Sequence, residues 1–351
     1  MGKYTAIDDP SAYFQVKTYT GTSGIHDVTL DGNSDMQPDL VWFKNRDVGY
    51  SHSIFDSSRG VNKPLSSDLS NAEASITNGL TRFDPDGFRV TSSAAVNENS
   101  IVCWNWHANA GSTSSNTDGS ITSTVQANTD AGFSIITYTG TGGGETFGHG
   151  LGVAPDMWIV KRRSGTGSWA VGFNDANILG GTSKYLILQG TGATSTYNNF
   201  WGSSPASSTV MRIAGDTTIG GSGSTYVAYA FAAKQGYSKF GKYVGNGSNT
   251  NGTFIYTGFR PAFVIAKRFD SGAHHWFMWD SERSPSNLVQ AVLKPNSDAV
   301  ESTLFQIDIL SNGFKHYNNY GSTNESGAEY IYMAFAENPF VTSTGIMGTA
   351  R

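Results

Sequence analysis

The chain has 351 residues with a formal net charge of -5, and charged residues make up only 15% of it. A length of this size predicts two or three domains, and the acidic balance lacks the clustered Lys and Arg that phosphate binding requires, so no nucleic-acid partner is expected. The 42 glycines and 13% aromatic residues exclude a disordered chain, because the large apolar side chains offset the entropy of ordering, and they predict a turn-rich all-β protein.

Neither membrane insertion nor export is expected from the sequence. No run approaches the ~18 apolar residues of a membrane span, and the first ten residues have no apolar signal core. Cys103 is the single cysteine, which excludes an intrachain disulfide and predicts folding in a reducing cytoplasm. Its apolar neighbours predict a small buried hydrophobe and not a nucleophile.

The first two elements of the chain recur three times in the same order. A predicted strand that ends in a glycine turn lies at residues 14–21, 133–140 and, more loosely, 240–245. A proline then starts an apolar run that ends in a lysine six residues later, at residues 38–44, 155–161 and 261–267. We expect the proline at the entry of a strand, where its missing N–H costs no ladder bond, and the lysine at the solvent end.

Two further elements complete each copy. An aromatic strand that ends in an acidic residue lies at residues 54–56, 169–175 and 276–280, and each copy closes on an aromatic run at residues 101–106, 226–231 and 330–335. Residues 225–231 alternate with a period of two, which is typical of a strand. Four landmarks in one order indicate a repeated unit with the size of a small domain.

The segments between these runs predict turns, a linker and little helix. Seven Asn-Gly or Asp-Gly pairs are predicted to supply the positive φ of tight hairpin turns, with their glycines at 32, 79, 87, 119, 247, 252 and 313. Only residues 67–74 and 287–293 could form a turn or two of helix. The polar residues 109–130 are predicted to form a linker or long surface loop, so the second and third units should be held together more rigidly than the first and second.

The predicted fold is therefore all-β, with three tandem antiparallel β-sandwich domains of a jelly-roll or concanavalin-like kind. Their boundaries are 1–112 for unit 1, 131–236 for unit 2 and 237–351 for unit 3.

Most chemically suggestive motifs have a simpler interpretation as turns or core. The glycine-rich residues 140–144 follow a strand as a phosphate loop would, but no helix follows them, which favours a hairpin turn. Residues 84–87, Asp-Pro-Asp-Gly, fit a β-turn better than a calcium loop. His274 and His275 should point to opposite faces of a strand, which disfavours chelation of one metal. No paired carboxylates or Ser/His/Asp set stand out, so we expect no enzyme, no cofactor and no metal site.

Aromatic residues beside polar neighbours are the one candidate binding site. Trp201 follows Asn199, and Trp276 follows His275. Exposed rings flanked by amides can stack on sugars, so these four residues could bind a glycan or a protein partner. The alternative is that both tryptophans cap the core of their own unit.

Five segments carry a resemblance to a known group of proteins. They are residues 7–21, 37–46, 55–60 (Phe-Asp-Ser-Ser-Arg-Gly), 83–88 and 334–341. Together they resemble an uncharacterised repeat domain of marine tailed-phage virion structural proteins, which are tail-fibre-like. The resemblance is strongest in units 1 and 3, because unit 2 has Phe-Asn-Asp-Ala at residues 173–176 in place of the Phe-Asp-Ser-x-Arg-Gly segment. It implies a place on the exterior of a virion and no known activity.

We therefore expect a non-enzymatic virion structural protein, either an exterior head-decoration protein or a tail or fibre component, that acts in particle assembly and stability. Its expected partners are other virion proteins and further copies of itself, with a trimer as one expected oligomer, after assembly in the host cytoplasm. The alternative is a tail adhesin that binds a host receptor or surface glycan. A third option, a polysaccharide depolymerase, would need two acids ~5–9.5 Å apart across a cleft.

Overall fold

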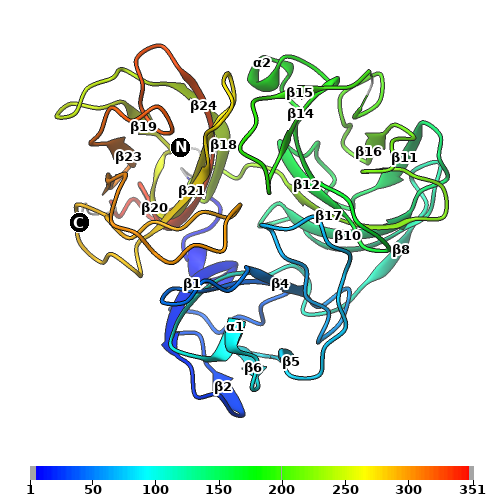
Figure 1. Cartoon of the computed structure of the whole chain (residues 1–351), viewed down its shortest axis with the longest axis horizontal. Coiled ribbons are helices and arrows are strands. Elements are labelled where there is room, and N and C mark those ends of the chain that lie inside the picture. Colours follow the sequence, from blue (N-terminus) through cyan, green and yellow to red (C-terminus); the bar gives the residue numbers. More distant parts are fainter. Residues whose placement is uncertain (1–4, 199, 348–351) are drawn as a thin grey trace.

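The computed structural model describes residues 5–198 and 200–347, and it is built from antiparallel sheets in three lobes around a common centre (Figure 1). The all-β prediction is confirmed. Each lobe corresponds to one unit of the sequence, with unit 1 in blue and cyan, unit 2 mainly in green, and unit 3 in yellow to red.

The main sheet of every unit has the same strand order: the opening, closing, proline and aromatic strands of the sequence. In unit 1 these strands are β1 (Phe14–Thr20), β7 (Ser100–Trp106), β3 (Leu40–Asn45) and β4 (Ser53–Asp56). In unit 2 they are β10 (Phe133–Thr139), β17 (Thr225–Phe231), β12 (Met157–Arg162) and β13 (Trp169–Phe173). In unit 3 they are β18 (Ser238–Val244), β24 (Glu329–Pro339), β20 (Phe259–Arg268) and β21 (Trp276–Asp280).

The pairing register defines which residues of the three units are equivalent. The lysines of the proline strands, for example, pair with Val102, Val227 and Ile331 of the closing strands. The same register shows that the acid at the end of β4 and β21 has no counterpart in β13, because Phe173 occupies that position.

Unit 2 has additional strands, and two of them lie in the segment predicted to be a linker. β8 (Ser114–Asn116) and β9 (Ser123–Asn128) continue its sheet beyond β10, and β14 (Lys184–Ile187) and β15 (Ser195–Thr196) continue it beyond β13. The linker prediction was wrong because a polar composition does not reveal backbone pairing, here with β10, the next strand along the chain. Gln126 of β9 even accepts hydrogen bonds from Ser57 and Ser58 of unit 1.

A smaller sheet covers one face of each main sheet, which gives every unit two layers. The small sheets are β2 (His26–Val28), β6 (Gly87–Val90) and β5 (Leu80–Asp84) in unit 1, β11 (Glu145–Gly148) and β16 (Val210–Ile213) in unit 2, and β19 (Phe254–Tyr256), β23 (Gly313–His316) and β22 (Ile307–Leu310) in unit 3. Separate apolar cores fill the space between the layers of units 1 and 2.

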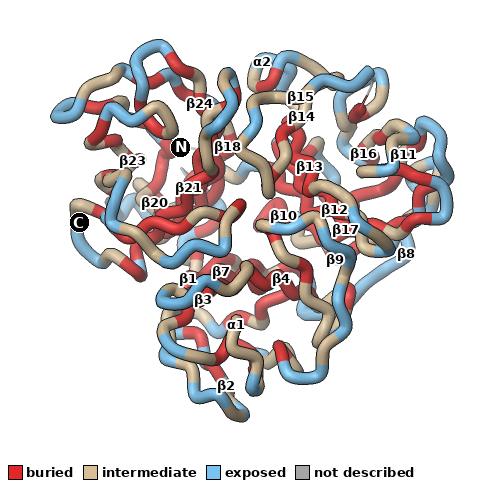
Figure 2. The backbone as a smooth tube through the Cα atoms, viewed as in Figure 1, coloured by how far each residue is buried: buried red, intermediate tan, exposed pale blue. Residues whose placement is uncertain are grey.

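The opposite faces of the three main sheets meet in one shared core. Phe14 of unit 1 stacks on Phe335 of unit 3, with 5.0 Å between ring centroids, and Phe231 of unit 2 lies 5.9 Å from the same ring. Figure 2 shows the buried backbone concentrated along these sheets. The main sheets are thus covered on both faces, which explains why their strands are continuous apolar runs. All three units pack on this one core, so the structure does not single out units 2 and 3 as the rigid pair.

Helix is restricted to single turns, and not where the sequence suggested it. α1 (Ala94–Asn97) and α2 (Ala176–Leu179) have four residues each, and η1 (Pro10–Ala12) is a short 3₁₀ turn. The predicted helical stretches 67–74 and 287–293 are instead irregular or bridge-forming segments, because their backbone groups bond to other segments. Among the residues described, no helix has the length and apolar character needed to cross a bilayer.

The turn glycines and one of the three repeated prolines differ from the sequence prediction. Of the seven glycines in Asn-Gly and Asp-Gly pairs, only Gly87 and Gly247 adopt positive φ. At Gly313 the requirement is close approach, because an added Cβ would lie 2.1 Å from the carbonyl oxygen of Ile255. Pro38 and Pro155 precede their strands as predicted, whereas the third proline lies inside β20 at a β-bulge, where a missing N–H is tolerated.

Candidate functional site

The most elaborate polar architecture in the molecule lies between the units, which contact one another in a closed ring. In each case the residue two positions after the proline-strand lysine accepts a backbone hydrogen bond from a loop of the preceding unit in the ring, where unit 3 precedes unit 1. These bonds join Glu73 N to Arg163 O (3.0 Å), Thr194 N to Phe269 O (2.9 Å) and Glu301 N to Arg46 O (2.9 Å). Unit 2 thus contacts the loop of unit 1, unit 3 that of unit 2, and unit 1 that of unit 3. We call these the 2–1, 3–2 and 1–3 interfaces; head-to-tail contacts of this kind close a ring.

A second repeated contact comes from the residue just before or at the start of each aromatic strand. Trp169 Nε1 donates to Ser66 O (2.8 Å) across the 2–1 interface, and Trp276 Nε1 donates to Ile187 O (3.1 Å) across the 3–2 interface. His52 occupies the equivalent position at the 1–3 interface, where its Nε2 lies 3.0 Å from Lys294 O.

The protonation state of His52 follows from its partners. Trp42 Nε1 donates to His52 Nδ1 (2.9 Å), so Nδ1 is the acceptor and Nε2 carries the proton that is shared with the carbonyl. Complete burial lowers the pKa of His52 to about 3, so the ring is neutral at physiological pH. The 1–3 interface therefore contains a titratable ring where the other two contain an indole.

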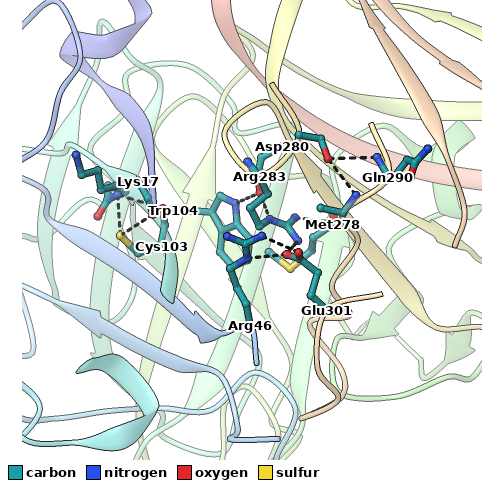
Figure 3. A network of polar contacts seen from close by, with 12 residues as sticks. Lys17, Arg46, Cys103, Trp104, Met278, Asp280, Arg283, Gln290 and Glu301 are labelled. Carbon is teal, nitrogen blue, oxygen red and sulfur yellow. Dashed lines mark hydrogen bonds and ion pairs between the residues drawn. The ribbon is translucent and has the colours of Figure 1, made fainter. Parts of the chain in front are cut away.

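The 1–3 interface also contains a network of charged residues, in which Asp280 and Arg283 are buried and Arg46 and Glu301 are partly buried (Figure 3). Arg46 of unit 1 forms a two-bond pair with Glu301 of unit 3, at 2.7 and 2.9 Å. Arg283 Nη1 donates to the same carboxylate (3.0 Å), and its Nε donates to Asp280 Oδ2 (2.6 Å). Trp104 Nε1 of unit 1 donates to that Asp280 oxygen at 3.1 Å, so the network spans the interface twice. Burial alone would raise the pKa of Glu301, but its bonds to the two arginines hold the pKa below its ordinary value.

The 2–1 interface repeats this network with one substitution. Arg163 of unit 2 pairs with Glu73 of unit 1 at 2.9 and 3.1 Å, Arg59 Nη1 donates to Glu73 (2.9 Å), and Arg59 Nε lies 2.5 Å from Asp56. The Tyr229 hydroxyl replaces the indole and donates to Asp56 Oδ2 at 2.6 Å. Burial raises the pKa of Tyr229 well above its ordinary value, which keeps the hydroxyl protonated as a donor.

The 3–2 interface has the same backbone contact but mainly apolar side chains at the positions of the charged network. Phe173, Phe269 and Met333 are buried at the positions that hold aspartate, arginine and the aromatic donor in the other two interfaces. Thr194 replaces the glutamate. The loss of the Asp-Ser-x-Arg segment from unit 2, visible in the sequence, is therefore the loss of one of three networks.

The lysines that end the proline strands are buried, so the prediction that they reach solvent was wrong. Lys44, Lys161 and Lys267 have no exposed surface, because turns and neighbouring loops cover the strand ends. Each ammonium donates to backbone carbonyls: Lys161 Nζ reaches Arg162 O and Gly167 O (both 2.9 Å) and Ser70 O of unit 1 (3.2 Å). Burial lowers the pKa of all three to about 8.

The residues predicted to bind a glycan do not form an exposed site. Trp201 is 3% exposed in the core between the layers of unit 2, and Trp276 is fully buried in the central core. Both indole N–H groups donate to backbone carbonyls. Trp201 caps the core of its own unit, as the alternative interpretation held, whereas Trp276 packs into the core shared by the three units and bonds to Ile187 of unit 2. His275 is half-buried beside Trp276, and Asn199 lies outside the described residues. All eight tryptophans are buried, so none offers an open ring face to a sugar.

The remaining motifs have structural roles. Residues 140–144 connect β10 to β11 in a different sheet, so they are not a hairpin, and Glu145 Oε1 accepts the N–H groups of Thr141 (2.8 Å) and Gly143 (3.1 Å). The loop N–H groups thus bind the carboxylate of Glu145. Residues 84–87 form the β5–β6 turn, as predicted. Within residues 5–198 and 200–347, no group of three or more His, Cys, Asp or Glu side chains is placed to hold a metal ion.

Cys103 is buried as predicted, and burial raises the pKa of its thiol to about 12, so it stays protonated.

The fold and its interfaces define an all-β protein in which three two-layered units close a ring within one chain. The chain matches the family described as Domain of unknown function (DUF7483) over residues 9–339, and it belongs to that family. The match extends across all three units as one domain, in agreement with their shared core. No curated protein and no solved structure matches the chain.

Proposed function

We propose that the chain is a non-enzymatic structural protein of a bacteriophage particle, located on the exterior of the head or in the tail or fibre, where it acts in assembly and stability. The sequence resemblance described above supports the phage setting. The structural role is supported chiefly by the interfaces, because the best-organised charged residues bond to one another across units.

The ring architecture suits a particle that must survive outside a cell. The two arginine–carboxylate networks are buried or partly buried, so salt screens them less than surface pairs. The proposed partners are other virion proteins and further copies of the chain, with a trimer as the proposed oligomer. Light scattering of the purified chain measures the latter: a mass of three chains supports the trimer, and a mass of one contradicts it.

The location is tested on purified particles with an antibody raised against the isolated chain. Regular gold labelling over the head supports a decoration protein, and labelling confined to the tail supports a tail or fibre component. Particles that contain no copy of the chain by mass spectrometry, from infected cells that express it, would overturn the proposal.

A host-glycan adhesin is the second candidate, and exposed aromatics on unit 3 favour it. Phe254 and Tyr256 are 43% and 47% exposed on the edge strand β19. Lys239 Nζ lies 5.2 Å from the centroid of the Tyr256 ring and adds a positive charge beside it. Binding on a glycan array that disappears in the double variant Phe254→Ala/Tyr256→Ala would support this function. Equal binding by the variant would contradict it.

A further inference from the structure

A small pocket lies between the two layers of unit 2, beside α2. Its free volume is about 20 Å³, which is enough for one water-sized group, since that needs roughly 10–15 Å³. Two buried tryptophans, Trp158 and Trp201, form part of its wall, with their rings edge to face at 5.4 Å. Arg212 of β16 and the polar side chains of Asn174 and Ser204 also line it.

The pocket depends on an exchange of side-chain size that only unit 2 has made. Gly172 occupies the position of Phe55 in unit 1 and Trp279 in unit 3. An added Cβ on Gly172 would lie 2.5 Å from Trp158 Nε1, so the glycine is required for the indole to fit. The large ring is thereby supplied by β12, where units 1 and 3 have valine.

This exchange leaves an indole N–H without an acceptor. Trp279 Nε1 in unit 3 donates to Phe305 O at 2.8 Å. Trp158 is 3% exposed, and no residue that the structure describes accepts a hydrogen bond from its Nε1. A buried donor without an acceptor costs about 1–3 kcal/mol in general, so such groups point to a missing partner.

Arg212 supplies a second donor and a positive charge. Its Nε is buried and has no acceptor among the described residues. The equivalent Arg89 of unit 1 pairs with Asp27, whereas Arg212 lies opposite Thr146 and forms no ion pair within residues 5–198 and 200–347. In unit 1 the guanidinium is thus paired with a carboxylate at the surface, whereas in unit 2 it has no counter-charge among the described residues and lies next to the pocket.

We infer that this pocket binds a carboxylate, with Trp158 and Arg212 as its donors. Two unpaired N–H donors and a guanidinium select an anionic oxygen acceptor, and arginine suits the planar carboxylate. The volume admits one oxygen of a carboxylate, from a small organic acid or from a glutamate or aspartate side chain of a partner protein, and it excludes a sugar ring. This site does not depend on the proposed location in a virion.

The test uses the indole N–H signals of the ¹⁵N-labelled full-length chain, titrated with sodium acetate at constant ionic strength. The Trp158 signal is expected to shift and saturate. Trp106 is the internal control, because its buried Nε1 also has no acceptor but lies in the central core away from the pocket. No saturable shift, or an equal shift of both signals, would overturn the inference and indicate an ordinary buried water.

Two variants and two peptides sharpen the result. Arg212→Gln should weaken acetate binding at least ~10-fold, since hydrogen bonds to charged groups contribute about 1.5–3 kcal/mol, whereas Arg212→Lys keeps the charge and should bind more tightly than Arg212→Gln. Unchanged binding by Arg212→Gln would contradict the assignment. The peptide acetyl-Gly-Glu-Gly-amide, compared with its glutamine analogue, distinguishes the sources: saturation at lower concentration than acetate identifies a partner's side chain, and saturation by acetate alone identifies a free acid.

Discussion

The 1–3 and 3–2 interfaces join equivalent surfaces of two units, one through charged side chains and the other through mainly apolar ones. Both have the same backbone hydrogen bond and equivalent strands, yet one contains Arg46, Glu301, Arg283 and Asp280 and the other contains apolar side chains. The repeat therefore does not require charge in order to close. Burying charges incurs a desolvation cost that a complete network only offsets, so an apolar replacement of similar volume can be equally stable.

The largest effect is expected when one charge is removed from a network and its partners remain. Among the described residues, Arg283→Met leaves Asp280 with the Trp104 indole and the backbone N–H of residue 283 as donors, and it leaves Glu301 with Arg46. Such a change should lower the free energy of unfolding by about 3–5 kcal/mol, because it leaves a buried carboxylate without its counter-charge. Urea unfolding measures the change. A loss below ~1 kcal/mol would mean that the network is solvated and that the two interfaces differ less than their burial indicates.

Transplanting the apolar interface tests the comparison directly. The five substitutions Arg46→Phe, Trp104→Met, Asp280→Phe, Arg283→Ala and Glu301→Thr install the 3–2 residues at the 1–3 interface. We expect the free energy of unfolding of this variant to lie within about 1–2 kcal/mol of that of the original chain, because no buried charge remains unpaired. It should therefore recover most of the stability that Arg283→Met loses. A variant less stable than Arg283→Met would show that the 1–3 interface requires its charged network in order to form.

The titratable ring at the 1–3 interface should make this interface the acid-sensitive one. The folded chain holds His52 neutral down to about pH 3, while the unfolded chain protonates it below its ordinary value of 6.5. The unfolded state thus binds one more proton between these values, and stability falls as the pH falls through that window.

The histidine contribution has an upper limit of about 1.4 kcal/mol per pH unit. His52→Gln keeps a neutral acceptor and donor without titrating, so its stability should fall less steeply than that of the original chain between pH 6.5 and 4.5. Measuring urea unfolding of the two proteins at pH 6.5 and pH 4.5 isolates the contribution of His52. His316, the other histidine with a pKa of about 3, is present in both proteins. Parallel pH profiles would exclude His52 as the source.

The smallest effects are expected at the buried lysines, where two interfaces can be compared by one substitution. Lys161 donates to three carbonyls, one of them across the 2–1 interface, whereas within the described residues Lys267 Nζ donates only to Arg268 O. Lys161→Met should cost about 1–2 kcal/mol, and Lys267→Met should be nearly neutral, because the relief of desolvation offsets the loss of one bond. Equal losses would mean that the carbonyl bonds do not determine stability. Thermal unfolding of both variants under one set of conditions provides the comparison.

The sequence predicted the repeated strands well because their signal is local. Apolar and aromatic runs at equivalent spacing became the main sheet of each unit, and the Asp-Ser-x-Arg segment was noticed although its role was not. The glutamates that complete the networks carry no sequence signal, since Glu73 and Glu301 lie in loops far along the chain from Arg163 and Arg46. The linker was misassigned for a different reason: residues 123–128 pair with β10, the next strand along the chain, and their polar composition conceals the strand.

The sequence by itself determined the all-β class, the three copies and the positions of the main strands within each copy, because period-two patterns and apolar runs act over a few neighbours. Only the tertiary structure decided that the units close a ring around one core. Lysines expected at the solvent end of a strand are buried because a neighbouring unit or turn covers that end. Trp201 and Trp276, considered as exposed binding residues, are buried because the layers of unit 2 and the shared core enclose them. Burial depends on what the rest of the chain places against a residue, which no local pattern contains.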